Sequence, residues 1–211
     1  MDILKIRALK KSFEKKIILN NISFDIKQGE FVCIYGKSGC GKSTLLNIIG
    51  LLDSFDSGKI EMFGKDIHNL FEYQKRNLIR TKIGYLFQNF ALIDTETVLY
   101  NLMIAMKYTK YTKSEKIKRI SDSLAAVNLS GYEKKPVYTL SGGEQQRVAV
   151  ARLMLKPSEI ILADEPTGSL DSENRNEIIT LLKRLNNDGK TVIIVSHDEY
   201  VVKMADRIIE I

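Results

Sequence analysis

The feature that most constrains the fold is a glycine-rich segment between an apolar strand and an apolar helix. Residues 36–43 read Gly-Lys-Ser-Gly-Cys-Gly-Lys-Ser and match the pattern G-x-x-x-x-G-K-[ST]. The apolar run Phe31–Tyr35 comes directly before this segment, and an apolar helix is expected to begin near Lys42. A glycine-rich turn can match such a pattern by chance, but strand, loop and helix in this order are typical of a P-loop. The sequence therefore predicts an α/β fold with a phosphate-binding loop.

The parts of this loop have distinct expected roles. Glycines let successive backbone N–H groups turn towards a phosphate, and the N-terminus of the following helix adds partial positive charge. Lys42 is expected to reach the β- and γ-phosphate oxygens, and the Ser43 hydroxyl to bind Mg²⁺. The residues predicted to hold the phosphates are Gly36, Lys37, Ser38, Gly39, Cys40, Gly41, Lys42, Ser43 and Thr44.

A second buried strand ends in two carboxylates. The apolar run 160–163 is followed by Asp164 and Glu165. Acidic residues end many strands for solubility alone, but beside a P-loop the same pattern predicts a magnesium and water site. We expect Asp164 to hold Mg²⁺ through water and Glu165 to polarise the attacking water. Hydrolysis of a phosphoanhydride depends on positioning and charge stabilisation, so no serine or cysteine nucleophile is required.

Two further polar residues follow apolar runs. Gln88 comes after the run 83–87, and His197 comes after the run 192–196. In open α/β sheets, ligands bind outside the carboxyl ends of the strands. We therefore expect Gln88 to act as a metal ligand and in catalysis, and His197 to position the γ-phosphate and the water.

The segment 140–147, Leu-Ser-Gly-Gly-Glu-Gln-Gln-Arg, offers two interpretations. Ser141 and Glu144 have the spacing of a capping box, which would simply begin a buried helix. The tandem glycines favour a second anion-binding helix N-terminus, because they let backbone N–H groups approach an anion closely. On that interpretation the nucleotide-binding residues are Ser141, Gly142, Gly143 and Glu144.

These motifs, in this order, resemble the nucleotide-binding subunit of an ATP-binding cassette (ABC) transporter over essentially the whole chain. The resemblance implies that ATP and Mg²⁺ are the cofactors and that two copies meet head to tail when ATP binds. Each ATP would lie between the P-loop of one copy and residues 141–144 of the other, with the loop Ser169–Asp171 nearby and Asp171 among the nucleotide-binding residues. Phe13 would stack on adenine; a core phenylalanine at a strand end is the alternative.

The resemblance also implies an architecture. It predicts one ABC-type ATPase domain over 1–211, with a RecA-like P-loop NTPase core that has a mainly parallel sheet. Residues 1–95 would form an antiparallel β subdomain and the P-loop part of the core. Residues 96–157 would form an α-helical subdomain that carries the 141–144 segment, and residues 158–211 would complete the core.

Local stretches favour particular branches of the family. Residues 84–90 and 164–171 resemble the macrolide-export and lipoprotein-release group, and residues 91–97 more closely resemble subunits of lactococcin-type bacteriocin exporters. About fourteen residues follow His197, which disfavours the sugar-import branch with its extra C-terminal domain. The implied protein is the motor of an exporter, docked on a separate transmembrane permease at the inner face of the plasma membrane.

Composition limits the alternatives. The 32 Lys and Arg outnumber the 26 Asp and Glu, and this basic balance keeps a nucleic-acid-associated ABC protein in consideration. Such relatives carry coiled coils, zinc modules or two cassettes, none of which is present here, so no nucleic acid is expected. A third alternative, a mechanical coupler that moves no cargo, stays open.

The sequence also bears on location. No apolar run approaches the roughly 18 residues of a membrane span, and no leader pattern begins the chain, so a cytoplasmic location is expected.

A basic run opens the expected helical subdomain. It can be a solvated helix face, or it can lie near anionic lipid headgroups when the subdomain docks on its partner. The residues are Lys107, Lys110, Lys113, Lys116, Lys118 and Arg119, with Glu115 among them.

Overall fold

The protein is described here from a computed structural model that covers residues 1–14, 16–168 and 170–211. Its centre is a five-stranded parallel sheet in the order β6-β7-β8-β3-β9. The inner strands are apolar runs with almost no exposed surface, as expected for strands covered on both faces. The five strands are β3 (Phe31–Tyr35), β6 (Ile83–Leu86), β7 (Ile160–Asp164), β8 (Thr191–Ser196) and β9 (Arg207–Glu210).

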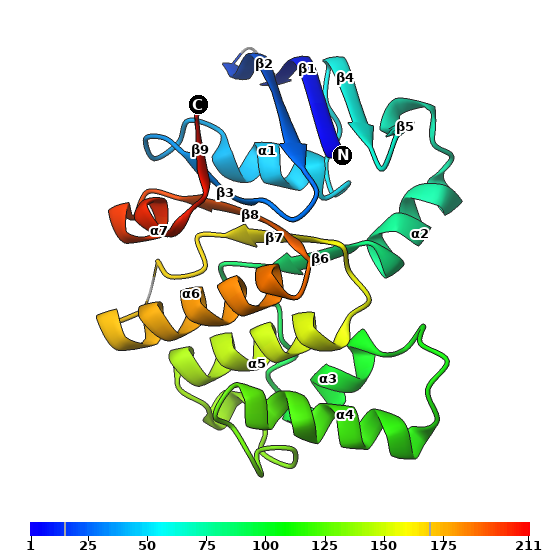
Figure 1. The fold of residues 1–211 in the computed structure, drawn as a ribbon, viewed down its shortest axis with the longest axis vertical. Coiled ribbons are helices and arrows are strands. Elements are labelled where there is room, and N and C mark those ends of the chain that lie inside the picture. Colours follow the sequence, from blue (N-terminus) through cyan, green and yellow to red (C-terminus); the bar gives the residue numbers. More distant parts are fainter. Residues whose placement is uncertain (15, 169) are drawn as a thin grey trace.

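A second, antiparallel sheet covers one side of the core. Its strand order is β2-β1-β4-β5, and helix α1 (Lys42–Ile49) lies between it and the parallel sheet (Figure 1). Leu45, Leu46 and Ile49 of α1 are fully buried between the two sheets, so this helix carries the P-loop on a rigid support. The four strands are β1 (Asp2–Phe13), β2 (Lys16–Lys27), β4 (Ser57–Met62) and β5 (Lys65–Asp66).

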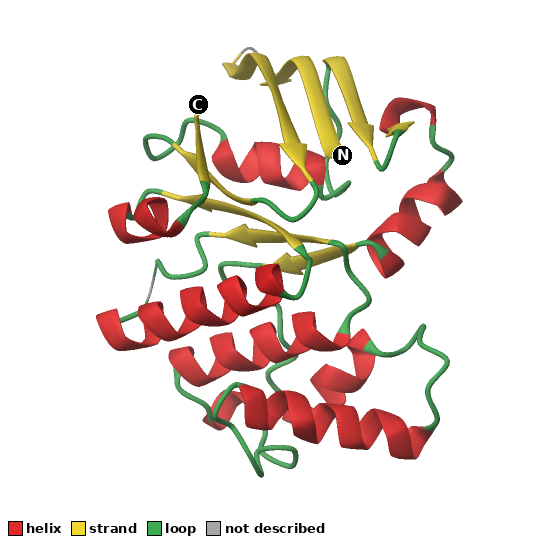
Figure 2. Ribbon diagram, viewed as in Figure 1, coloured by secondary structure: helices red, strands yellow, loops and turns green. Residues whose placement is uncertain are grey.

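Helices cover the opposite face of the parallel sheet (Figure 2). Helix α5 (Gly142–Leu155) packs against α3, α4 and α6, and its buried residues join one core with theirs. A capping box begins α4: the Glu115 backbone N–H donates to Thr112 Oγ1, and a Glu115 carboxylate oxygen accepts from the Thr112 backbone N–H. The other helices of this layer are α3 (Val98–Ala105), α4 (Lys113–Ala126) and α6 (Ser172–Asn187).

Several elements were not expected from the sequence. Helix α2 (Glu72–Thr81) lies within residues 1–95, for which an antiparallel β subdomain and the P-loop part of the core were predicted and no helix at 72–81 was expected. None of its residues is buried, and only Tyr73, Leu78 and Ile79 of its ten residues are apolar. Short 3₁₀ helices at Ile67–Asn69 and Val137–Thr139, helix α7 (Glu199–Met204) and strand β9 complete the described fold. Among the described residues, no helix is both long enough and apolar enough to cross a bilayer.

Candidate nucleotide site

The segments that follow β3, β6, β7 and β8 meet at one edge of the parallel sheet. Together they line a pocket of about 320 Å³. The structure thus brings Lys42, Gln88, Glu165 and His197 to one place, although they are far apart in the sequence. The lining residues are Ser38, Gly39, Gly41, Lys42, Ser43, Gln88, Glu165, Gly168 and His197.

The P-loop holds its lysine inside the loop. Lys42 is only 6% exposed, and its Nζ donates to the carbonyl oxygens of Gly36 at 2.8 Å and Lys37 at 2.9 Å. Gly41 has a φ of 99°, and a Cβ there would lie 2.8 Å from Ile18 Cγ2, so a side chain is excluded at this position. Among the described residues, the hydrogen-bond partners of the Lys42 ammonium are these two neutral carbonyls, which an anionic oxygen can replace with a stronger interaction.

The predicted metal ligands Ser43 and Asp164 are in contact. Ser43 Oγ donates to Asp164 Oδ1 at 2.9 Å. Burial raises the pKa of the Asp164 carboxyl, the charge of Glu165 adds to this, and the Ser43 hydrogen bond opposes it. A hydroxyl, a carboxylate and the nearby Gln88 amide are all hard oxygen donors of the kind that Mg²⁺ prefers, so the residues present fit that ion.

The Glu165 side chain is held from two sides. Its Oε1 lies 2.9 Å from His197 Nδ1, and its Oε2 accepts from Ser196 Oγ at 3.3 Å. The Glu165 side chain is 14% exposed and that of His197 is 65% exposed. Glu165 also has a φ of 42°, in the left-handed region that non-glycine residues seldom adopt. This backbone conformation turns the chain sharply at the end of β7, where the carboxylate faces the pocket.

Phe13 lies at the end of β1 and is not a core residue. It is 49% exposed, and the Nζ of Lys11 lies 4.7 Å from its ring centroid. Lys11 is in turn nearly buried and pairs with Asp53 at 3.0 Å. The core alternative for Phe13 is therefore wrong, and adenine stacking stays a prediction.

The start of α5 contains the capping box that the sequence offered as one of two interpretations. The Ser141 backbone N–H donates to Glu144 Oε2 at 2.8 Å, and the Tyr132 hydroxyl donates to Glu144 Oε1 at 2.8 Å. The first of these bonds lowers the pKa of the Glu144 carboxyl most strongly. Because both carboxylate oxygens of Glu144 are engaged in the cap, Ser141, Gly142 and Gly143 are the better candidates for contact with an anion.

Other predicted residues lie away from the pocket. Asp171 caps α6, where its two carboxylate oxygens accept from the backbone N–H and the side-chain amide of Asn174. Thr44 is half-buried in α1 and does not line the pocket, and Ser169 lies outside the described residues.

Comparison with known proteins decides the family. A family model described as "ABC transporter" matches residues 19–168. The chain belongs to the ABC transporter family. The predicted ABC-type P-loop fold is confirmed, and the protein is an ABC ATPase. No comparison bears on the lactococcin-type assignment.

Several relatives of this ABC ATPase are similar over nearly its full length. It is 41% identical over 215 residues to a macrolide export ATP-binding/permease protein MacB of Mannheimia succiniciproducens, covering 100% of this chain and 33% of the relative. The chain therefore spans about a third of the length of the MacB relatives. It is also 43% identical over 198 residues to an uncharacterized ABC transporter ATP-binding protein of Methanocaldococcus jannaschii, covering 93% of this chain and 88% of that protein.

The solved structures that resemble this ABC ATPase include a dimer. The ATP-binding cassette MJ0796, in a dimeric post-hydrolysis state bound to ADP and Pi, has a TM-score of 0.89 and 39% sequence identity. The match covers 99% of this chain and 94% of that one.

Two polar links in the ABC ATPase were not expected from its sequence. Arg152, at the end of α5, donates to the carbonyl oxygens of Phe90 and Ala91, just after Gln88. Phe90 and Ala91 have φ values of 62° and 48°, so Arg152 stabilises a strained turn beside the pocket. Burial lowers the pKa of Arg152 to about 10. A lone arginine in a last helical turn carries no sequence signal of such a role, because the same residue favours any helix C-terminus.

The second link joins the start of α5 to α6. Arg147 Nη1 contacts Asn174 Oδ1 at 2.6 Å and Glu177 Oε2 at 2.8 Å. A Cβ on Gly143 would lie 2.4 Å from Asn174 Oδ1, so this glycine is needed for the close approach of the two helices. Gln146 Nε2 donates to the Pro166 carbonyl at 2.8 Å, which connects α5 to the loop after Glu165.

Proposed function

We propose that this protein is the ATP-hydrolysing subunit that powers an ABC exporter through a separate transmembrane permease. The observation that carries the proposal is the convergence of Lys42, the Ser43–Asp164 pair and the Glu165–His197 pair on one pocket. These groups supply the charge, the metal ligands and the base that phosphoanhydride hydrolysis needs.

Nucleotide binding would use the P-loop as it stands. The Lys42 ammonium exchanges its two carbonyl contacts for β- and γ-phosphate oxygens, and the loop N–H groups and the α1 N-terminus stabilise the negative charge. Ser43, Asp164 and Gln88 would hold Mg²⁺, which when bound neutralises phosphate charge and orients the phosphates. Phe13 stacks on adenine with its exposed ring.

Glu165 then acts on the water. Its carboxylate accepts a hydrogen bond from the attacking water and takes the proton as the water oxygen bonds to the γ-phosphorus. The bond between the γ-phosphorus and the β–γ bridging oxygen breaks in the same step, which releases ADP and phosphate. The contacts with Ser196 Oγ and His197 Nδ1 fix the orientation of this carboxylate. The His197 ring is largely exposed, so its other nitrogen, Nε2, would contact the γ-phosphate while Nδ1 stays on Glu165.

A second copy would complete the site. The N-terminus of α5, with Ser141, Gly142 and Gly143, is an anion-binding helix end that does not line the pocket of its own chain. We infer that it contacts the nucleotide held by the partner copy in a head-to-tail dimer. The dimeric state of the similar cassette MJ0796 supports this arrangement.

An apolar groove that includes Phe87, the residue before Gln88, supports docking on a permease. It has a volume of about 290 Å³, and apolar side chains dominate its lining, including Leu52, Ile79, Phe87 and Ile104. Leu52 and Ile104 are 51% and 47% exposed, which is costly for a free surface and favours an apolar helical segment of a partner. Arg152 lines this groove as well as holding the Phe90–Ala91 turn, so an occupant of the groove would contact the Gln88 loop.

We favour export as the direction of transport, with a peptide, a macrolide or a lipoprotein as the cargo. The support is the similarity to the MacB relatives, whose name includes macrolide export and which join an ATP-binding part and a permease in one protein. In this proposal the permease chooses the cargo, and this chain works at the inner face of the membrane.

The test is reconstitution. Affinity-tagged protein should copurify with a multi-span membrane protein, and vesicles containing both should hydrolyse ATP and move cargo. The Glu165→Gln variant should retain the complex but stop cargo movement. Hydrolysis without any cargo movement would instead identify a mechanical coupler, and copurification with nucleic acid alone would overturn the proposal.

A further inference from the structure

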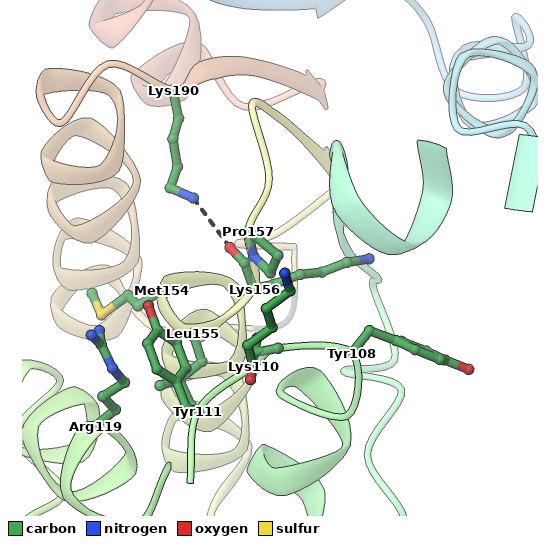
Figure 3. A pocket seen from close by; sticks show the side chains of 10 residues that line it. Tyr108, Lys110, Tyr111, Arg119, Met154, Leu155, Lys156, Pro157 and Lys190 are labelled. Carbon is green, nitrogen blue, oxygen red and sulfur yellow. Dashed lines mark hydrogen bonds between the residues drawn. The ribbon is translucent and has the colours of Figure 1, made fainter. Parts of the chain in front are cut away.

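A second, larger pocket lies at the other end of the parallel strands. Its volume is about 580 Å³ (Figure 3). Lys190 lines it directly before β8, the strand whose far end leads to His197, so the strand separates this pocket from the nucleotide site. The opposite wall comes from the α3–α4 connection and from Arg119 of α4. The pocket therefore lies between the parallel-sheet core and the helical layer.

The lining of this pocket is strongly basic. Lys110, Arg119, Lys156 and Lys190 contribute to it, and no carboxylate is present among the described lining residues. In Figure 3, Lys190 and Lys110 extend from opposite walls towards the turn between Lys156 and Pro157. The nearest acidic influences, Asp188 on Lys190 and Glu115 on Arg119, come from outside the lining. Like charges thus face one hollow without a matching anion.

Two of these cations are partly removed from water. Burial and the charge of Arg152 lower the pKa of Lys156 to about 8, and burial lowers the pKa of Lys190. The Lys190 Nζ donates to the Ser158 carbonyl at 2.9 Å, a neutral partner. Burial disfavours the charged form of a lysine, and for Lys190 the charge of Asp188 offsets this only in part. An anion in the pocket would favour the charged form of both lysines.

The geometry of Arg119 is suited to a phosphate. Its guanidinium carbon lies 3.9 Å from the ring centroid of Tyr111, which also lines the pocket. Stacking on an aromatic ring fixes the plane of the guanidinium and leaves its N–H edge available for two oxygens of one phosphate.

We propose that this pocket is a binding site for a ligand with two or more phosphate groups, held between Lys110 and Arg119 on the helical side and Lys190 on the core side. The volume is within the range of small-molecule sites. A ligand that contacts both walls would restrain the α3–α4 connection against the core, so the site would regulate the ATPase from outside its nucleotide pocket. The phosphates can come from a soluble phosphate ester or from a lipid headgroup.

The experiment uses the absence of tryptophan from the sequence. Tyr108→Trp places a single fluorescent reporter in the lining of the pocket. Tripolyphosphate is titrated with ADP in excess, so that the P-loop is occupied, and the titration is repeated in the Lys42→Ala background. A saturable fluorescence change of the same midpoint in both backgrounds is expected.

Matched variants locate the binding. The double variant Lys110→Gln/Arg119→Gln should weaken tripolyphosphate binding by about tenfold or more, the loss expected for two phosphate contacts. The control Lys113→Gln/Lys118→Gln removes the same charge from residues of the same segment that do not line the pocket, and it should change the midpoint by less than about twofold. No saturable change, or equal weakening in both double variants, would overturn the proposal.

Vesicle binding distinguishes the two possible sources of the phosphates, a lipid headgroup and a soluble phosphate ester. Phosphatidylcholine vesicles with and without cardiolipin, which carries two phosphates, are sedimented with the protein and both double variants. Cosedimentation that depends on cardiolipin and is lost only in Lys110→Gln/Arg119→Gln identifies a headgroup. Tripolyphosphate binding without such cosedimentation identifies a soluble ester.

Discussion

At the scale of single residues, the polar groups of the candidate nucleotide site have partners within the chain. Lys42 contacts two loop carbonyls, Ser43 contacts Asp164, and Glu165 contacts His197. These contacts fix the orientation of the side chains to which we assign roles in hydrolysis. This preorganisation keeps the cost of ordering the site low.

Replacement of Glu165 tests the base directly. Glu165→Gln keeps the shape and the contact with Ser196 but removes the proton acceptor, so the ATPase rate should fall by about a hundredfold or more while nucleotide still binds. Phosphate release measures the rate, and size-exclusion chromatography with ATP should reveal an accumulated dimer. The exposed Glu173→Gln in α6 serves as the control. Hydrolysis at the wild-type rate in Glu165→Gln would remove this residue from the catalytic role.

The two cysteines should differ in reactivity. Cys33 is fully buried in β3, and burial raises the pKa of its thiol to about 11, so only about one molecule in a thousand is a thiolate at pH 8. Cys40 is half-buried in the P-loop. N-ethylmaleimide should therefore label Cys40 first and stop ATP hydrolysis, and MgATP should protect it. Mass spectrometry of the labelled peptides is the measurement, and faster labelling of Cys33 would contradict the described burial.

At the scale of elements, the sequence predicts segments better than it predicts the contacts between them. The P-loop, the strand before Asp164 and the capping boxes depend on local patterns, and the structure contains them. Helix α2 was missed because only Tyr73, Leu78 and Ile79 of its ten residues are apolar and none of its side chains is buried. The bonds from Arg152 to residues 90 and 91 join positions about sixty apart, so no local pattern could predict them.

The two glycines at the start of α5 should respond differently to alanine. Gly143→Ala should destabilise the protein by about 1–3 kcal/mol, because Asn174, which the new Cβ would meet, is held by Arg147 and Asp171. In Gly142→Ala the new Cβ would lie 3.9 Å from its nearest neighbour, Phe90 Cζ. The free energy of unfolding should therefore change by less than about 0.5 kcal/mol. Urea unfolding measures both. Adding Asn174→Ala should recover part of the loss in Gly143→Ala; equal stability of the two alanine variants would refute the steric reason.

Loss of Arg152 should affect the Gln88 loop. Arg152→Gln removes the charged hydrogen bonds to Phe90 and Ala91, so the strained turn should relax, at a cost of about 1–3 kcal/mol in stability. If Gln88 binds the metal, turnover should also fall, and more Mg²⁺ should be needed for half-maximal rate. Arg184→Gln, in the last turn of α6, is the matched control. An unchanged Mg²⁺ dependence in a folded Arg152→Gln protein would separate this arginine from the metal site.

At the scale of the whole molecule, the helical layer and the core meet along two hollows that share Tyr108 and Lys156. One hollow is apolar and the other is basic, and both interrupt the packing along this part of the boundary between the two layers. Regions with fewer buried contacts open at lower free energy than the core. We therefore expect relative motion of the two layers to take place at this boundary.

Stability should depend on pH through Lys156. Its folded pKa of about 8 is below the ordinary lysine value, so the folded state loses its proton first and its stability rises as pH increases from about 8 towards the unfolded pKa. Lys156→Met should therefore raise the midpoint of urea unfolding at pH 7 and raise it less at pH 9.5. The exposed Lys118→Met is the control and should show neither effect. An equal gain at both pH values would assign the change to packing alone.

Helix α5 has fourteen residues, which at 1.5 Å per residue is about 21 Å of nearly rigid rod. Gln146 fastens it to Pro166, Arg147 to Asn174 and Arg152 to Phe90. Rotation of the rod about its own axis would break all three attachments at once, whereas a shift along or across that axis can carry the attached loops with it. A displacement applied to one end of the helix therefore reaches the other end with little bending, while the three attachments guide its direction.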